Sequence, residues 1–167
     1  MEDILLVDED DNIIGKEEKL SAHKSGKLHR AFSVFVFNSK KELLIQKRAQ
    51  GKYHSAGLWS NTCCSHPVTE DTKKEAEERL KEEMGFSCEL EELFSFIYEI
   101  EFKNGLKEHE FDHVFKGKYN GPVMPNIKEV MNYKWVAPEK LHEDIKKNPG
   151  SYTHWLKLCL SRVISFS

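Results

Sequence analysis

Short apolar runs dominate the first 50 residues and are typical of β-strands. The run at 28–37 is dense in aromatic and β-branched residues and too apolar for an exposed edge, so it predicts a buried strand. Polar turn residues at 38–42 follow it, and we expect 31–48 to form a hairpin. Runs at 4–7 and 13–15 flank an acidic turn and predict an antiparallel pair. Residues 17–22 fit either a short helix or a loop, and the remaining strand is expected at 43–48.

A helix is predicted between Thr72 and Gly85. Its apolar residues recur four positions apart and form a stripe: Ala76, Leu80 and Met84. Thr72 and Glu75 have the spacing of a capping box, and Gly85 stands where a C-terminal cap glycine is expected.

The second half of the chain returns to strands and ends in helices. Lys103-Asn104-Gly105 is a hairpin turn signal between two β-like segments. The expected elements are strands at 88–102, 106–119 and 131–136, a helix that begins at Pro138 and ends at 148–150, and a last helix at 151–166.

Many strands, few helices and no regular β–α–β alternation predict an α+β fold around a mixed or antiparallel sheet. The length of 167 residues fits one domain. No repeat, low-complexity tract or linker divides the sequence, so we expect residues 1–167 to form a single domain.

Composition narrows the classes of function. Twenty-five Lys and Arg residues against 28 Asp and Glu give a net charge of −3, which offers no general attraction to nucleic acid or to an anionic membrane. No apolar run approaches the ~20 residues of a membrane span, and no signal peptide is recognisable at the start. We expect a cytoplasmic protein whose partner is a small molecule, with no nucleic acid and no membrane bound.

The four cysteines agree with a reducing compartment. Cys63 and Cys64 are adjacent, and Cys88 and Cys159 are isolated, so no disulfide framework is implied and reduced thiols are expected.

Three of the eight histidines are candidates for chemistry. His23 and His29 flank a short glycine-containing loop, and His66 follows two cysteines. Spacing alone leaves open whether they share a metal site. For the other five, a solvated or hydrogen-bonded role is expected: His54, His109, His113, His142 and His154.

Carboxylates gather on one predicted strand. Period-2 alternation places Glu108, Glu110 and Asp112 on one face, where they are either solvated or held by a cation. Together with imidazoles, such carboxylates suit a divalent transition metal better than calcium.

The predicted helix carries charged residues on one face. Glu75, Arg79 and Glu83 lie four positions apart, either as a surface ion-pair ladder or at a pocket edge, with Glu83 available for magnesium and Arg79 for phosphate. Arg48, Lys52 and Lys19 could add a clamp on an anion.

Three strings between residues 43 and 86 resemble the type 1 isopentenyl-diphosphate Δ-isomerase family of the Nudix superfamily. They are residues 44–49 (LIQKRA), 57–67 (GLWSNTCCSHP) and 79–86 (RLKEEMGF), and the Trp-x-Asn-x-x-Cys-x-His-Pro string is the most specific. The resemblance extends to 21–23, 28–33, Tyr98, 108–110, 133–135 and Trp155, and so covers nearly the whole chain.

The resemblance implies a Nudix-like α/β/α sandwich around a mixed β-sheet with flanking helices. It also implies isomerisation of isopentenyl diphosphate to dimethylallyl diphosphate in isoprenoid biosynthesis, by a [1,3] allylic proton shift. Cys64 would be the catalytic cysteine, and Glu110, next to Tyr98, the acid on the opposite face of the substrate. The chain is expected to be a monomer or a homodimer.

The same resemblance implies two metal positions and a binding site for the substrate. One divalent metal, Mn²⁺, Mg²⁺ or Zn²⁺, would be bound by His23, His29, His66, Glu108 and Glu110. Glu83 would hold a second ion, Mg²⁺, that bridges to the diphosphate. The diphosphate contacts would be Lys19, Arg48, Lys52 and Arg79, and Trp155 would line the hydrocarbon pocket.

Two alternatives stay open. The pair Glu82 and Glu83 would also suit a Nudix-type pyrophosphohydrolase of nucleoside diphosphate derivatives. Those relatives carry Arg-Glu where this chain has Glu78-Arg79, and the reversal removes a metal ligand that hydrolysis needs. The second alternative is a non-catalytic module that binds a metal or a phosphorylated ligand.

Overall fold

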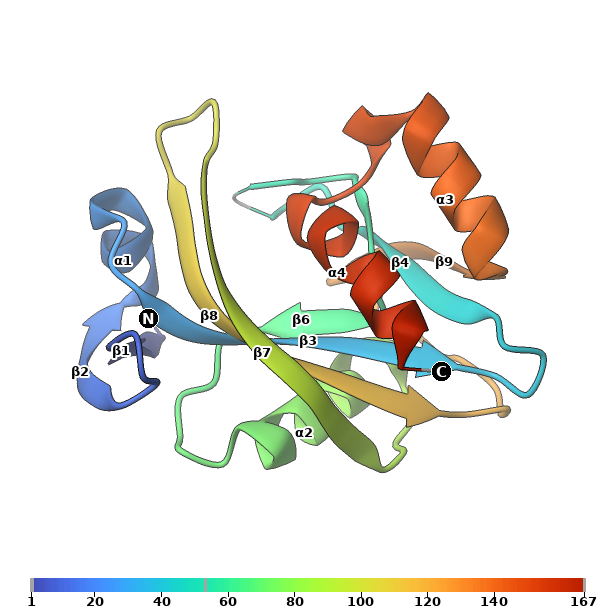
Figure 1. Ribbon diagram of the computed structural model, residues 1–167, viewed down its shortest axis with the longest axis horizontal. Helices are drawn as coiled ribbons and strands as arrows, with labels where there is room; N and C mark the ends of the chain where they lie inside the picture. The colour runs from blue at the N-terminus through green and yellow to red at the C-terminus, as the bar shows by residue number, and fades with distance from the viewer. Residues whose placement is uncertain (1, 53, 167) are drawn as a thin grey trace.

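The computed structural model describes residues 2–52 and 54–166, in which nine strands form one mixed sheet (Figure 1). The strands are β1 (Asp3–Val7), β2 (Ile13–Glu18), β3 (His29–Phe37), β4 (Leu43–Arg48), β5 (Trp59–Ser60), β6 (Cys63–Ser65), β7 (Leu90–Glu101), β8 (Lys107–Lys118) and β9 (Val130–Val136). The helices are α1 (Lys19–Ser25), α2 (Thr72–Met84), α3 (Pro138–Lys147) and α4 (His154–Ser165), with a 3₁₀ turn at Pro149–Ser151.

Strand β3 is paired on both edges. One edge pairs in parallel with β8 along its whole length. The other edge is shared by β1 at His29, by β6 at residues 32–34 and by β4 at Phe37. The predicted hairpin at 31–48 is therefore wrong except at its turn: β4 pairs with β3 only at Phe37 and Leu43, and then pairs with β9. The edges of β3 are already occupied, so β4 has to find another partner.

Helices cover both faces of the sheet, with α2 on one side and α3 and α4 on the other (Figure 1). Phe32, Val34 and Val36 of β3 pack with the apolar stripe of α2, whereas Phe35 and Phe37 belong to the core that α4 closes. Burial on both faces explains the uninterrupted apolar run at 28–37. The expected α/β/α sandwich is confirmed.

Helix α2 begins and ends close to its predicted bounds, but its N-terminal cap differs. The carboxylate of Asp71 accepts the N–H of Lys74 at 3.1 Å, so the capping box of Thr72 and Glu75 is wrong. Glu75 instead accepts the backbone N–H groups of Val68 and Thr69. It thereby ties the segment that follows His66 to the helix.

Gly85 ends α2 as predicted, in the left-handed conformation with φ of 77°. A Cβ atom there would lie 2.2 Å from the carbonyl oxygen of Met124, so only glycine fits.

Other boundaries shift by a few residues. Helix α4 begins at His154 instead of Ser151, because a 3₁₀ turn occupies Pro149–Ser151. Strands β5 and β6 have two and three residues, too short for a periodic pattern to reveal. None of the described helices is long and apolar enough to cross a membrane.

All four cysteines are free thiols, as expected.

Candidate active site

Three of the predicted site residues lie side by side on three adjacent strands, β7, β8 and β3. Tyr98 on β7 pairs with Glu110 on β8, and Glu110 pairs with His29 on β3. Glu108 lies two positions before Glu110, so both carboxylates point to the same face of β8. Both are buried, and Glu108 is only 2% exposed.

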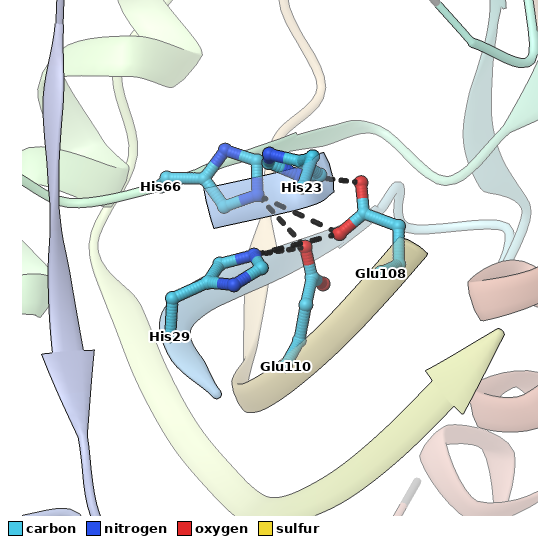
Figure 2. A group of neighbouring side chains, drawn as sticks. All are labelled: His23, His29, His66, Glu108 and Glu110. Carbon is cyan, nitrogen blue, oxygen red and sulfur yellow. Dashed lines mark hydrogen bonds and ion pairs between the residues drawn. The ribbon is translucent and has the colours of Figure 1, made fainter. Parts of the chain in front are cut away.

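Five side chains converge next to this row (Figure 2). Their ligand atoms all lie within 4.8 Å of one another, and they come from α1, β3, the segment after β6, and β8: His23, His29, His66, Glu108 and Glu110. The structure thus brings together the complete set that the resemblance implied for the first metal.

The backbone sets the orientation of two of the imidazoles. Nδ1 of His23 lies 2.6 Å from the carbonyl oxygen of Lys19, and Nδ1 of His29 lies 2.8 Å from that of Lys27. A carbonyl only accepts, so each Nδ1 carries the proton and donates it. Each Nε2 therefore faces the cluster, the arrangement that metal-binding histidines usually have.

Three buried atoms in the cluster lack a hydrogen-bond partner among the described residues: Nδ1 of His66, Nε2 of His29 and Oε2 of Glu108. The last two lie 3.6 Å apart. Burial opposes ionisation of Glu108, but contacts with Glu110 and the imidazoles hold its pKa well below the usual value. An ionised carboxylate that faces an unpartnered imidazole nitrogen fits a divalent cation.

The cluster opens into a cavity of about 280 Å³. Nine predicted site residues line it, together with His54 and several small residues: Lys19, Arg48, Lys52, Cys64, His66, Arg79, Glu108, Glu110 and Trp155. Four predicted site residues are not among those that line the cavity: His23, His29, Glu83 and Tyr98.

Cys64 lies across β3 from the carboxylates. It pairs with Ser33 on the edge of β3 opposite to β8. Burial raises the pKa of the Cys64 thiol to about 12, although the positive charge of Arg48 lowers it. The guanidinium Nη1 of Arg48 lies 3.9 Å from the sulfur. Cys64 therefore keeps its proton at neutral pH in this structure.

Tyr98 supports Glu110 from behind. Burial and the charge of Glu110 raise the pKa of Tyr98 well above 10, so its hydroxyl stays protonated and donates to Oε1 of Glu110 at 2.5 Å. The other carboxylate oxygen, Oε2, lies 2.8 Å from Nε2 of His66. Burial and the charge of Glu110 raise the pKa of Asp112, the next carboxyl on this face of β8, and Oδ2 of Asp112 accepts the hydroxyl of Ser33 at 2.7 Å.

Two of the cationic side chains of the cavity, Arg79 and Lys52, meet at the carboxylate of Glu129. Arg79 donates from Nε to Glu83 at 2.6 Å and pairs with Glu129 at 3.1 Å. Lys52 pairs with the same carboxylate oxygen of Glu129. Glu83 is 3% exposed and lies behind Arg79, where Gln46 donates to it at 3.1 Å.

Trp155 is fixed on α4 by its indole N–H. It donates to the hydroxyl of Ser60 at 2.9 Å and to the amide oxygen of Asn61 at 3.0 Å. The guanidinium carbon of Arg48 lies 5.2 Å from the centre of the indole ring. This contact places a cation on an aromatic wall of the cavity.

Sequence reasoning missed two residues of the site. His54 is buried, and its Nε2 lies 2.6 Å from Oε1 of Glu108. Of the two roles expected for it, the structure shows the hydrogen-bonded one, at a place that the sequence did not indicate. The second residue, Glu129, pairs with Lys52 and Arg79, two of the predicted diphosphate contacts. In the sequence, His54 could have been found only by its closeness to Lys52, and no sequence feature pointed to Glu129.

Comparisons with known proteins agree with this geometry. Residues 27–156 match the family model of the NUDIX domain. A relative from Aromatoleum aromaticum, named isopentenyl-diphosphate Delta-isomerase 2, is 53% identical, over 99% of this chain and 88% of its own length. A relative of the same name from Photorhabdus laumondii is 52% identical, over 94% of this chain and 90% of its own length.

Solved structures share the fold at low identity. A protein of Deinococcus radiodurans superposes with a TM-score of 0.78 at 20% identity and covers 96% of this chain and 98% of that one. A MutT NUDIX hydrolase from Burkholderia pseudomallei gives 0.64 at 19% identity, with 82% and 98% covered. Fold and site together define a NUDIX-domain protein. Within that superfamily, the chain belongs to the isopentenyl-diphosphate Delta-isomerase family.

Proposed function

We propose that this protein isomerises isopentenyl diphosphate to dimethylallyl diphosphate, with Cys64 and Glu110 as the two groups that exchange protons with the substrate. One observation carries the proposal. The two residues line the same cavity from β6 and β8, the strands on opposite edges of β3. A five-carbon chain held between them meets one group on each side.

The reaction needs two proton transfers. One proton is added at C4 and another leaves C2, and the tertiary cation between these steps has no heteroatom to stabilise it. We assign donation to Glu110 in its carboxylic acid form, next to the hydroxyl of Tyr98, and acceptance to Cys64 in its thiolate form. The two transfers leave a carboxylate and a thiol, so one proton has to return from Cys64 to Glu110 before the next turnover. Arg48 favours the thiolate that acceptance requires, whereas burial opposes it. Trp155 offers the cation an aromatic face.

His23, His29, His66, Glu108 and Glu110 are proposed to hold one divalent ion, Mn²⁺, Mg²⁺ or Zn²⁺. Glu83 is proposed to hold a Mg²⁺ next to the diphosphate, after it exchanges its contact with Arg79. When bound, these ions would supply positive charge that favours the Cys64 thiolate and neutralises the diphosphate.

Lys19, Arg48, Lys52 and Arg79 are proposed to bind the diphosphate. Their charge would position the otherwise featureless hydrocarbon through remote binding energy. The walls of the cavity keep water from the cation. The cytoplasmic location, the single domain and the monomeric or homodimeric state stay predictions.

The pyrophosphohydrolase alternative loses support at α2. The guanidinium of Arg79 occupies the helix position at which those relatives carry a metal-binding carboxylate, and it pairs with Glu82 and Glu83. Fewer carboxylates therefore remain for the ions that hydrolysis requires.

Proton NMR in heavy water tests the proposal. The protein is incubated with isopentenyl diphosphate, Mg²⁺ and Mn²⁺, and we expect dimethylallyl diphosphate with deuterium incorporated. Nucleoside diphosphate derivatives are assayed in parallel for release of phosphate-containing products. Hydrolysis without isomerisation would support the pyrophosphohydrolase, and tight metal binding without turnover of either substrate would support the non-catalytic module.

A further inference from the structure

His54 joins two parts of the site that are separate in the sequence. It lies in the loop at 49–58 between β4 and β5, which also carries Lys52. Its Nε2 lies 2.6 Å from Oε1 of Glu108, closer than the 3.2 Å between that oxygen and Nε2 of His23. His54 is 7% exposed, although it belongs to a loop.

Aromatic contacts hold the imidazole in place. The ring stacks on Phe102 with centroids 4.5 Å apart and planes 10° apart, and it meets Trp155 edge-on at 5.8 Å. Nδ1 of His54 lies 3.3 Å from the hydroxyl of Ser55, which can donate to it. Nε2 then carries the proton and donates it to Glu108.

This contact divides the two oxygens of Glu108 between different roles. Oε1 faces His54 and His23, whereas Oε2 has no hydrogen-bond partner among the described residues. Oε2 lies 3.6 Å from Nε2 of His29 and 3.8 Å from Nε2 of His66. His54 thus holds the carboxylate so that one oxygen points at the cluster.

The same residue reaches the anion-binding end of the cavity through its backbone. The carbonyl oxygen of His54 accepts Nη2 of Arg48 at 3.4 Å. Arg48 and Lys52 both line the cavity. Glu108 is therefore connected through His54 to Arg48 at the end of β4 and to the loop that carries Lys52.

We propose that His54 is a positioning residue that orients Glu108 for the metal and couples occupancy of the metal site to anion binding by the loop at 49–58. The inference rests on the metal and diphosphate sites of the proposed function. Coupling is reciprocal, so an anion that raises metal affinity by some factor has its own affinity raised by the same factor.

Two substitutions separate the hydrogen bond from the packing. His54→Phe keeps a ring that can stack on Phe102 but removes the donor. His54→Gln removes the ring but keeps an N–H close to the position of Nε2. His142→Phe on α3 is the matched control, and circular dichroism verifies that every variant is folded.

Mn²⁺ binding is measured without substrate, by the electron paramagnetic resonance signal of free Mn²⁺, with and without inorganic sulfate as a weakly chelating dianion. We expect His54→Phe to weaken Mn²⁺ binding by about 10-fold or more, the usual effect of losing a partner of a metal ligand. We also expect this variant to lose the increase in affinity that sulfate produces, and His54→Gln and His142→Phe to stay near the unsubstituted protein.

The inference is overturned if His54→Phe binds Mn²⁺ as the unsubstituted protein does, or if it keeps the full effect of sulfate. It is also overturned if His54→Gln is as weak as His54→Phe, because the ring and not the donor would then matter. None of these results depends on turnover. Failure of the isomerase assay with normal Mn²⁺ binding would therefore count against the proposed function alone.

Discussion

The hydroxyl of Tyr98 donates to Oε1 of Glu110 at 2.5 Å, and the two residues are paired across β7 and β8. The ladder between two long strands thus sets the distance between a hydroxyl that cannot ionise at neutral pH and the carboxylate it polarises. The other oxygen of Glu110, Oε2, lies 2.8 Å from Nε2 of His66. Both oxygens are held, so the carboxylate presents a defined edge to the cavity.

Tyr98→Phe should lower kcat without unfolding the protein. The substitution removes the hydroxyl and keeps the ring, which lies 5.5 Å from that of Phe96. Loss of a group that assists proton transfer costs about 100-fold or more in rate. Kinetics of isomerisation by NMR, with thermal denaturation as the folding control, provide the measurement. A variant as active as the unsubstituted protein would remove Tyr98 from the mechanism.

Metal binding should release a proton and tighten as the pH rises. Burial lowers the pKa of His29, but the carboxylates of Glu108 and Glu110 outweigh it and raise the value to about 10. The metal-free imidazole is therefore protonated at pH 7, whereas a ligand must be neutral. Affinity should increase between pH 7 and pH 10, by up to about tenfold per unit.

Calorimetric titration with Mn²⁺ in buffers of different ionisation enthalpy counts the protons released from the protein. About one proton is expected at pH 7. Proton release near zero, together with an affinity independent of pH, would show that His29 is neutral before the metal binds.

Glu129→Gln should strengthen anion binding. One oxygen of Glu129 pairs with Lys52 and with Arg79, two of the cations that we propose bind the diphosphate. The amide keeps the size of the side chain and removes the competing charge. Surface ion pairs contribute about 0.2–1 kcal/mol each, and the substitution removes two, so we expect about a two- to 30-fold gain in sulfate affinity by calorimetry. A loss of affinity would instead mean that Glu129 positions the two cations.

Gly85→Ala should destabilise the protein more than Gly105→Ala. Both glycines have positive φ, 77° and 82° respectively, so both substitutions bring backbone strain of about 1–2 kcal/mol. Only at Gly85 does the new Cβ meet a backbone atom, the carbonyl oxygen of Met124 at 2.2 Å; nothing lies within 4 Å of a Cβ at Gly105. Urea denaturation measures the difference, and equal losses would contradict the close approach.

Local patterns predicted most elements because they depend on neighbouring residues. The stripe of α2, its glycine cap and the hairpin at 103–105 fall into this class. The capping box was wrong because two backbone N–H groups before the helix compete for the carboxylate of Glu75. The hairpin at 31–48 was wrong because strand pairing depends on residues far away, here those of β8.

Prediction of the site was also limited to what neighbouring residues determine. Alternation along β8 placed Glu108 and Glu110 on one face, but no spacing could show that His23, His29 and His66 meet them. The histidines come from α1, from β3 and from the segment after β6, and they meet the carboxylates because β3 pairs with β8 on one edge and with β6 on the other. Only the family resemblance predicted this set. His54 and Glu129 were missed because their roles arise only from contacts across the fold.

Two adjacent cysteines, Cys63 and Cys64, allow the most direct test of the proposed proton transfer by Cys64. Cys64 lines the cavity, whereas Cys63 points to the opposite face of β6 and packs in the core with α2. Isomerisation of isopentenyl diphosphate is measured by NMR for Cys64→Ala and Cys63→Ala, with unfolding of both monitored by circular dichroism. We expect Cys64→Ala to be folded and inert and Cys63→Ala to keep most of the activity. A fully active Cys64→Ala protein would contradict the catalytic role proposed for Cys64.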